Sequence, residues 1–167
     1  MKQKLALCCA LIHRPTVLFL DEPTTGVDTV SRKEFWEMLK RLKAQGITIL
    51  VSTPYMDEAM LCERIALIQN GEIMSINTPE RIISEYPKKL YAIKSKNMSH
   101  LLQDIRRFDG IESCNSFGEN HHISFNADND FENQQKLIAY LHAKNHQQIE
   151  FKPVRPTIED CFIKLMN

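Results

Sequence analysis

The sequence predicts an α/β fold, with a parallel-sheet core in its first half and a smaller α+β unit in its second. Two apolar runs in the first half, residues 16–20 and 47–51, are separated by a segment with apolar residues at helical spacing. Two strands joined by one helix form a parallel pair. In the second half, the strand and helix patterns follow in the order β-α-β-β-α-β, which indicates a separate unit with a mixed arrangement.

Composition excludes some classes of function. The 167 residues include 21 basic and 21 acidic side chains, so the formal net charge is zero and nothing points to nucleic acid. The longest apolar run, 5–12, is too short to span a bilayer, so we expect contact with a membrane only through a partner. Five scattered cysteines without a C-x-x-C pair suit a reducing, cytoplasmic compartment.

Residues 2–13 predict an amphipathic helix. Its apolar residues at helical spacing are Leu5, Cys8, Cys9 and Ile12. We therefore expect Cys8 and Cys9 to lie on the buried face as small apolar side chains.

Two adjacent carboxylates follow the first apolar run. A continuous run such as 16–20 is typical of a strand that is buried on both faces. The carboxyl ends of parallel strands open onto the crevice where α/β sheets bind ligands. Asp21 is therefore placed to hold a Mg²⁺ ion, directly or through water, and Glu22 to polarise an attacking water.

The next segment predicts a helix, a second strand and a short third helix. Asp28 or Thr29 would cap the helix, and Gly46 would end it. Trp36 is expected to be a packing residue. The core stripe of the helix is Phe35, Met38, Leu39 and Leu42. Residues 55–62 predict a short helix after the second strand.

Turn residues predict the structure of the following segments. Asn70-Gly71 lies between the candidate strands 64–69 and 72–77, and both turn positions need positive φ, so a hairpin is expected. Thr78 and Pro79 predict the start of another short helix.

The second half is expected to begin after a linker at 87–89 and to form a ferredoxin-like unit. Its two neighbouring histidines, His121 and His122, fall in a strand and point to opposite faces, so they do not share a metal. Residues 157–160 match a capping box before a terminal helix. No catalytic constellation appears in this half, and interaction or regulation is the expected role.

Three segments together resemble the ATP-binding cassette (ABC) transporter ATPases. Residues 17–28 are similar to the Walker B and D-loop motifs, and 52–59 to the switch loop and the helix after it. Residues 1–5 look like the tail of the LSGGxxQ motif. The resemblance covers roughly 1–86 and implies part of a P-loop NTPase core there, with a small accessory domain at 87–167.

The resemblance also implies roles for single residues. Glu22 would be catalytic, Asp21 would bind Mg²⁺ and ATP, and Asp28 would belong to the D-loop at the interface between two cassettes. Gln3 and Pro54 occupy positions of the nucleotide site. The implied cofactors are ATP and Mg²⁺. The implied partners are a second cassette and a transmembrane permease, at the inner face of the cell membrane.

Two departures from the family limit what this chain does alone. It contains no GxxxxGK[ST] loop, whose backbone N–H groups, lysine and hydroxyl hold the phosphates and Mg²⁺. Pro54 stands where the family has a histidine, and proline offers neither a side-chain donor nor a backbone N–H. We therefore expect the C-terminal part of a cassette, truncated from a longer ancestral chain, and little ATP binding or turnover by these residues alone.

One other function competes with this interpretation, and a second can be set aside. The chain would be a non-catalytic interaction or regulatory fragment if it completes a separately encoded N-terminal half. Haloacid-dehalogenase phosphatases also place a carboxylate after an apolar strand, but Pro23 occupies the position of their second acidic residue.

Overall fold

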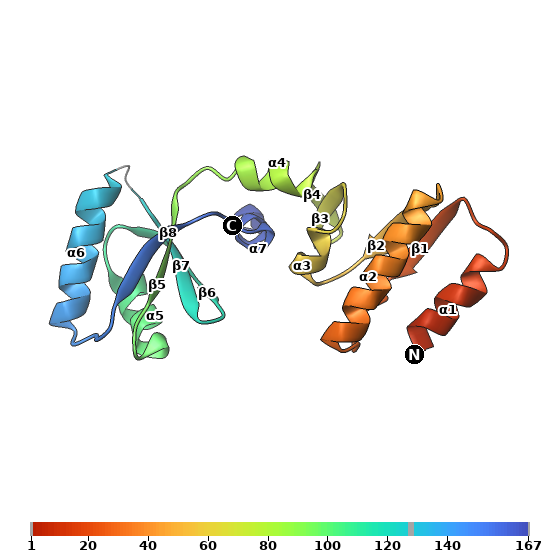
Figure 1. The fold of residues 1–167 in the computed structure, drawn as a ribbon. Coiled ribbons are helices and arrows are strands. Elements are labelled where there is room, and N and C mark those ends of the chain that lie inside the picture. The colour runs from red at the N-terminus through yellow and green to blue at the C-terminus, as the bar shows by residue number, and fades with distance from the viewer. Residues whose placement is uncertain (1, 127–128, 167) are drawn as a thin grey trace. The chain divides into compact units, whose positions relative to one another are not determined.

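A computed structural model describes residues 2–126 and 129–166, with side chains in the first helix from Leu5 onward (Figure 1). The helices are α1 Lys2–Leu11, α2 Thr29–Ala44, α3 Met56–Ala59, α4 Pro79–Ser84, α5 Met98–Arg107, α6 Asp130–Ala143 and α7 Ile158–Met166. The strands are β1 Val17–Asp21, β2 Thr48–Ser52, β3 Ile65–Gln69, β4 Glu72–Asn77, β5 Leu90–Lys94, β6 Ile111–Phe117, β7 Asn120–Phe125 and β8 Glu150–Val154.

The chain divides into two compact units. The N-terminal unit comprises residues 1–66 and 76–79, and the C-terminal unit comprises 67–75 and 80–167. The division therefore falls inside the β3–β4 hairpin. Among the described residues, no helix combines the length and the apolar character that crossing a bilayer requires.

The N-terminal unit is built on a parallel pair of strands. β1 and β2 run in register from Val17 opposite Thr48 to Asp21 opposite Ser52, so the predicted parallel pair is confirmed. α2 connects the two strands and packs on one face of the pair. Its core cluster joins α1, β1 and α2 through Leu7, Leu18, Phe35, Trp36 and Leu39.

The ends of α2 agree with the prediction. The Asp28 carboxylate accepts a hydrogen bond of 2.9 Å from the Ser31 backbone N–H, which satisfies one of the free donors of the first turn. Gly46, at φ +90°, follows the helix in a conformation that only glycine adopts easily. Trp36 is a packing residue, as expected, and is 6% exposed.

The prediction that β1 is buried on both faces is wrong for this chain. Leu18 is 5% exposed, but Val17 is 44% and Phe19 is 72% exposed. In the neighbouring strand β2, Leu50 is 61% exposed. The apolar run is real, yet only one face of the pair is covered by helices within the described residues. The sheet therefore presents an apolar face without cover.

The predicted buried face of α1 is also wrong. Leu7 is 2% exposed and packs in the core, whereas Leu5 is 67% and Ile12 is 73% exposed. Cys8 and Cys9 are exposed free thiols rather than buried side chains. From Leu5 to Leu11 the helix is apolar on every side, so spacing alone does not decide which side meets β1 and α2.

The uncovered apolar face of β1 and β2 should bind exposed-hydrophobe dyes and favour self-association. Replacing Phe19 and Leu50 together by threonine, a β-branched residue that suits strands, removes apolar surface. We expect less binding of an exposed-hydrophobe dye and less self-association, with a free energy of unfolding changed by no more than about 0.5 kcal/mol. Val30→Thr, at another exposed apolar position, is the control. Unchanged dye binding in the double variant would show that this face is covered in solution.

The hairpin between the two halves forms as predicted. β3 and β4 pair in a two-stranded sheet, and Asn70 and Gly71 take positive φ values of 52° and 82°. The third helix is shorter than the predicted 55–62. After Met60 the backbone bonds change to an i→i−3 pattern, because Leu61 donates to the Glu58 carbonyl at 2.9 Å.

The C-terminal unit contains a four-stranded antiparallel sheet, with α5 and α6 on one of its faces. Its strand order is β6-β7-β5-β8, and its elements follow in the order β-α-β-β-α-β. α5 and α6 cover one face and form the core together with β5, β6 and β7. The fully buried members of that core are Ile93, Leu101, Ile105, Ile123, Leu137 and Leu141.

The two neighbouring histidines have separate partners on opposite faces of the sheet, as predicted. The His121 Nε2–H donates to the Met98 carbonyl at 2.8 Å, on the face covered by α5. His122 Nδ1 lies 2.9 Å from an Asp160 carboxylate oxygen. Both rings are therefore used in hydrogen bonding within the unit, and they do not form a shared metal site.

Asp160 fixes the start of α7. The predicted capping box forms, since the Asp160 N–H donates to Thr157 Oγ1 at 3.2 Å and the Thr157 N–H donates to Asp160 at 2.8 Å. Burial of this carboxylate opposes ionisation, but the hydrogen bonds from His122 and Thr157 outweigh it, so the pKa of Asp160 lies below its ordinary value of 3.8. The side chain is 4% exposed.

Acid is expected to weaken this part of the fold. Because the pKa of Asp160 is lower in the folded than in the unfolded chain, its stabilisation is complete above the unfolded value near pH 4 and is lost as the pH falls through the folded value. Asp160→Asn should lower the free energy of unfolding at pH 7 by about 1–3 kcal/mol and flatten its acid dependence. Urea unfolding at pH 7 and at several pH values below 4 tests this, with Glu159→Gln as the exposed control. An equally steep acid loss in Asp160→Asn would assign the effect to other groups.

Candidate active site at the carboxyl edge of the parallel strands

The two predicted carboxylates lie where β1 ends. Asp21 is the last residue of β1 and pairs in register with Ser52, the last residue of β2. The Ser52 hydroxyl donates to an Asp21 carboxylate oxygen. Both carboxylates, Asp21 and Glu22, are exposed at this edge. The parallel register therefore brings them to the mouth of the sheet, where ligands bind in α/β folds.

The backbone at Glu22 is strained and anchored. Its φ of 42° lies in the left-handed region, which is uncommon for a residue with a side chain. The Glu22 N–H donates to the Ser52 carbonyl at 3.1 Å and to the Ser52 hydroxyl at 3.0 Å. The Glu22 carboxylate in turn accepts from the Thr25 hydroxyl at 3.0 Å. The chain is thus turned sharply out of the sheet, with Glu22 held to the end of β2.

A third carboxylate, Glu58 in α3, lies buried behind these loops. One of its oxygens, Oε2, accepts hydrogen bonds from the Thr24 hydroxyl at 2.9 Å and the Thr53 hydroxyl at 2.6 Å. The other, Oε1, accepts from Arg32 Nε at 3.0 Å. Burial opposes ionisation of Glu58, but these hydrogen bonds outweigh it and the pKa lies below its ordinary value of 4.5. The group is therefore an ionised, internally paired carboxylate at neutral pH.

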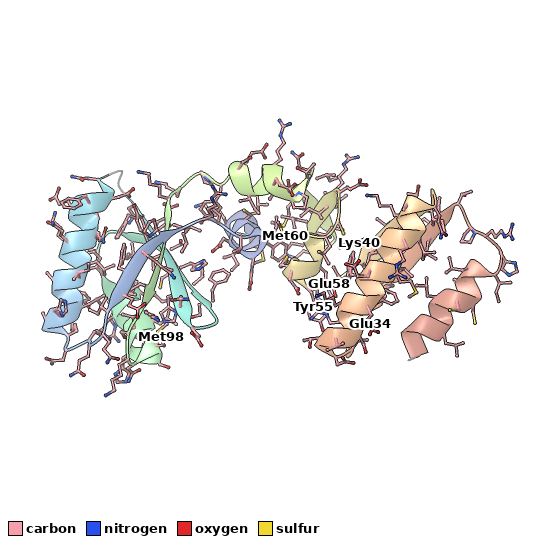
Figure 2. The ribbon with its side chains drawn as sticks, in the orientation of Figure 1. Glu34, Lys40, Tyr55, Glu58, Met60 and Met98 are labelled. Atoms are coloured by element: carbon pink, nitrogen blue, oxygen red, sulfur yellow. The ribbon has the colours of Figure 1, made fainter. Side chains whose placement is uncertain are left out.

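Arg32 balances that buried charge. Its Nη2 also donates to Asp57 at 3.1 Å, and its guanidinium carbon lies 4.2 Å from the centre of the Tyr55 ring. Figure 2 shows Tyr55 and Glu58 beside α2, the helix that carries Arg32. A guanidinium suits this position because it forms several directed hydrogen bonds and stacks on an aromatic ring.

The other predicted site residues take different places. Asp28 is exposed and caps α2, where hydrogen bonding from Ser31 lowers its pKa below 3.8. Pro54 is exposed two residues after the end of β2, next to Thr53. Gln3 lies in α1, and its side chain falls outside the described part of the structure. The structure therefore places Asp21 and Glu22 side by side at the end of β1, and Pro54 in the loop that follows β2.

The exposed oxygen atoms at this edge suit a hard divalent cation. Carboxylate and hydroxyl oxygens are the ligands that Mg²⁺ prefers, and Asp21 and Ser52 offer both. No cluster of three or more histidine, cysteine or acidic side chains forms among residues 2–126 and 129–166, so such an ion would need further ligands from water or phosphate. The part of an ATP site that holds phosphates, a glycine-rich loop with its lysine, is absent from these residues.

Sequence reasoning did not find the Glu58 network. The three partners of this carboxylate, Thr24, Arg32 and Thr53, lie 34, 26 and 5 residues away along the chain. No local spacing pattern in the sequence predicts such contacts. The one hint was an acidic residue in a segment already expected to be a helix beside the site.

Some known proteins match about half of the chain, and one matches nearly all of it. The chain is 48% identical over 79 residues to the probable multidrug ABC transporter ATP-binding protein YbhF of Escherichia coli, a match that covers 47% of the chain and 14% of that protein. The Nod factor export ATP-binding protein I of Sinorhizobium fredii is 45% identical over 86 residues, 51% of the chain and 25% of that protein. The protein of that name from Rhizobium sp. strain N33 is 31% identical over 167 residues, 99% of the chain and 52% of that protein.

These relatives and the strand-end carboxylates define the class of the protein as the ATP-binding proteins of transporters. Within this class, the chain belongs to the ABC transporter ATP-binding proteins. The chain spans about half the length, or less, of the curated relatives it matches. No family model matches it.

Proposed function

We propose that the chain supplies the Walker B, D-loop and switch-loop part of an ATP-hydrolysing ABC transporter subunit. One observation carries the proposal. Asp21, at the end of β1, pairs in register with Ser52 at the end of the parallel strand β2, and the Ser52 hydroxyl is hydrogen-bonded to both Asp21 and Glu22. Such a site also needs a phosphate-binding loop, and these 167 residues contain none.

Each site residue receives a role in this proposal. Asp21 would hold Mg²⁺, which when bound neutralises charge on the phosphate oxygens. Glu22 orients and polarises the attacking water, with its carboxylate steadied by Thr25. Asp28 belongs to the loop that faces a second cassette, and Gln3 to the end of the LSGGxxQ motif. Since positioning and electrostatics dominate phosphoryl transfer, the chain without a phosphate cradle would bind ATP weakly and hydrolyse none.

Residues 87–167 are proposed to be a ferredoxin-like accessory domain, after a cassette portion spanning 1–86. Its strand order and its β-α-β-β-α-β sequence of elements support that arrangement. The proposed partners are a second cassette and a transmembrane permease, which would hold the protein at the cytoplasmic face of the membrane.

A chimera tests the proposed function. The part of the Rhizobium sp. N33 relative that precedes its matched segment is joined to residue 1, and Mg-ATP hydrolysis is measured. We expect turnover in the chimera and none in the chain alone. Because Pro54 has no donor for the γ-phosphate, Pro54→His should raise the turnover of the chimera. A folded chimera that hydrolyses no ATP with either residue at position 54 would contradict the proposal.

The second candidate is a non-catalytic fragment that completes a separate N-terminal half. The exposed apolar face of β1 and β2, with Phe19 72% and Leu50 61% exposed, favours it. Such a fragment would form a stoichiometric complex with the upstream half of the relative, supplied as a separate polypeptide, yet the complex would show no hydrolysis. Hydrolysis by that complex would favour the enzymatic subunit instead.

A further inference from the structure

One buried carboxylate connects the two loops of the candidate site. Glu58 is 2% exposed and accepts hydrogen bonds from a threonine in each loop. Thr24 belongs to the turn that follows Glu22, and Thr53 belongs to the loop that carries Pro54. Both hydroxyls meet the same oxygen, Oε2, so a displacement of this atom disturbs both loops together.

Each loop also depends on its threonine for its own backbone. In the first loop, the Val27 N–H donates to the Thr24 carbonyl at 3.1 Å. In the second loop, the Tyr55 N–H donates to the Thr53 hydroxyl at 3.2 Å. The amides of Val27 and Tyr55 therefore report the order of the two loops separately.

The cation beside Glu58 ties the same group to α2. Arg32 binds Oε1 of Glu58 at 3.0 Å and is 19% exposed. It lies in the first turn of the helix that Asp28 caps. A buried ion pair whose carboxylate also accepts other hydrogen bonds is rigid, and removal of one member leaves the other without compensation. Glu58 therefore holds three segments in one geometry: the turn after β1, the loop after β2 and the start of α2.

We infer that Glu58 is a positioning residue that makes the turn after Glu22 and the loop carrying Pro54 move as one unit. Glu58 acts through Thr24 and Thr53, and no direct contact with nucleotide or with the attacking water is assigned to it. Its consequence for ATP hydrolysis rests on the proposed function. The mechanical link between the loops does not, because it is a property of the chain itself.

Hydrogen exchange of single amides in the 167-residue chain tests the link. Thr53→Val leaves Glu58 charged and paired with Arg32, but removes one hydroxyl. We expect faster exchange at Val27, in the other loop, by about twofold or more, the lower end of coupling between residues that share one network. Thr24→Val should have the reciprocal effect at Tyr55. The reference is the amide of Leu39 inside α2, whose exchange should stay unchanged.

Substitution of the carboxylate itself should affect both loops. Glu58→Gln keeps the volume of the side chain but removes its charge, and we expect exchange at Val27 and Tyr55 to rise by about tenfold or more relative to Leu39. Glu37→Gln, in an exposed pair with Lys40 on α2, is the matched control and should change neither amide. The inference is overturned if each threonine variant affects its own loop alone. If Glu58→Gln fails to fold, the two threonine variants still decide.

The catalytic consequence is measured separately in the chimera. Glu58→Gln should lower kcat while KM for ATP stays within about twofold, since the group lies behind the loops and contacts no nucleotide. A chimera without turnover would count against the proposed function only, and the exchange result would stand. Coupled exchange with an unchanged kcat would confine Glu58 to a structural role and overturn its role in positioning for catalysis.

Discussion

Glu22→Gln is expected to lower the kcat of the chimera, in its Pro54→His form, by about 10²–10⁴-fold, the usual contribution of a general base. The amide keeps the size of the side chain and can still accept from the Thr25 hydroxyl, so the turn should persist. KM for ATP should change little, because Glu22 is proposed to act on water rather than on the nucleotide. Steady-state hydrolysis over a range of ATP concentrations measures both quantities.

The control for this prediction is Glu37→Gln, an exposed glutamate on α2 that has the same chemistry and lies away from the sheet edge. It should leave kcat unchanged. Equal hydrolysis by Glu22→Gln and its parent would show that another group activates the water. The role of Glu22 would then be limited to shaping the turn.

Leu137→Ala is expected to lower the free energy of unfolding of the C-terminal unit by about 2–5 kcal/mol. Leu137 is fully buried in α6, where it packs with α5 and the sheet. Truncation removes apolar contacts and leaves a cavity that the close-packed neighbours only partly fill. Urea unfolding followed by a probe in the C-terminal unit, such as the fluorescence of its tyrosines, gives the change.

Phe131→Ala is the matched variant on the same helix. Phe131 is 71% exposed, so removal of its ring should change the free energy of unfolding by no more than about 0.5 kcal/mol. A similar loss in both variants would mean that α6 is not anchored through Leu137, and the description of this core would be wrong.

Much of the fold was predictable because local chemistry determines it. Asn70-Gly71 needs positive φ at both positions, and the hairpin formed there. Asp28 precedes the helical stripe and caps α2. The parallel pairing of β1 and β2 follows from their spacing around that helix. These features depend on residues close together in the chain.

The errors concern burial, which depends on what covers a surface. Phe19 belongs to a run that reads as doubly buried, yet one side of it lies open in this chain. Cys8 and Leu7 are both apolar positions of one helix, and only packing against β1 and α2 selects Leu7. A periodicity identifies a helix or strand, but not the neighbour that covers it.

The candidate site likewise has a part that the sequence predicts and a part that it does not. Asp21 and Glu22 could be predicted because they directly follow a strand. The link between their turn and the loop after β2 could not, since Glu58 meets Thr24 across 34 residues. Such tertiary contacts become visible only when α3 is placed behind the two loops.

Calorimetric titration with Mg-ATP, performed on the 167-residue chain and on the chimera, tests the central claim most directly. The claim is that the chain provides the carboxylate edge of an ABC ATPase site and lacks the phosphate cradle. We expect no heat of binding for the chain alone and saturable binding for the chimera. Micromolar binding by the chain alone would contradict the claim, because the phosphates of ATP would then be held without a glycine-rich loop and its lysine.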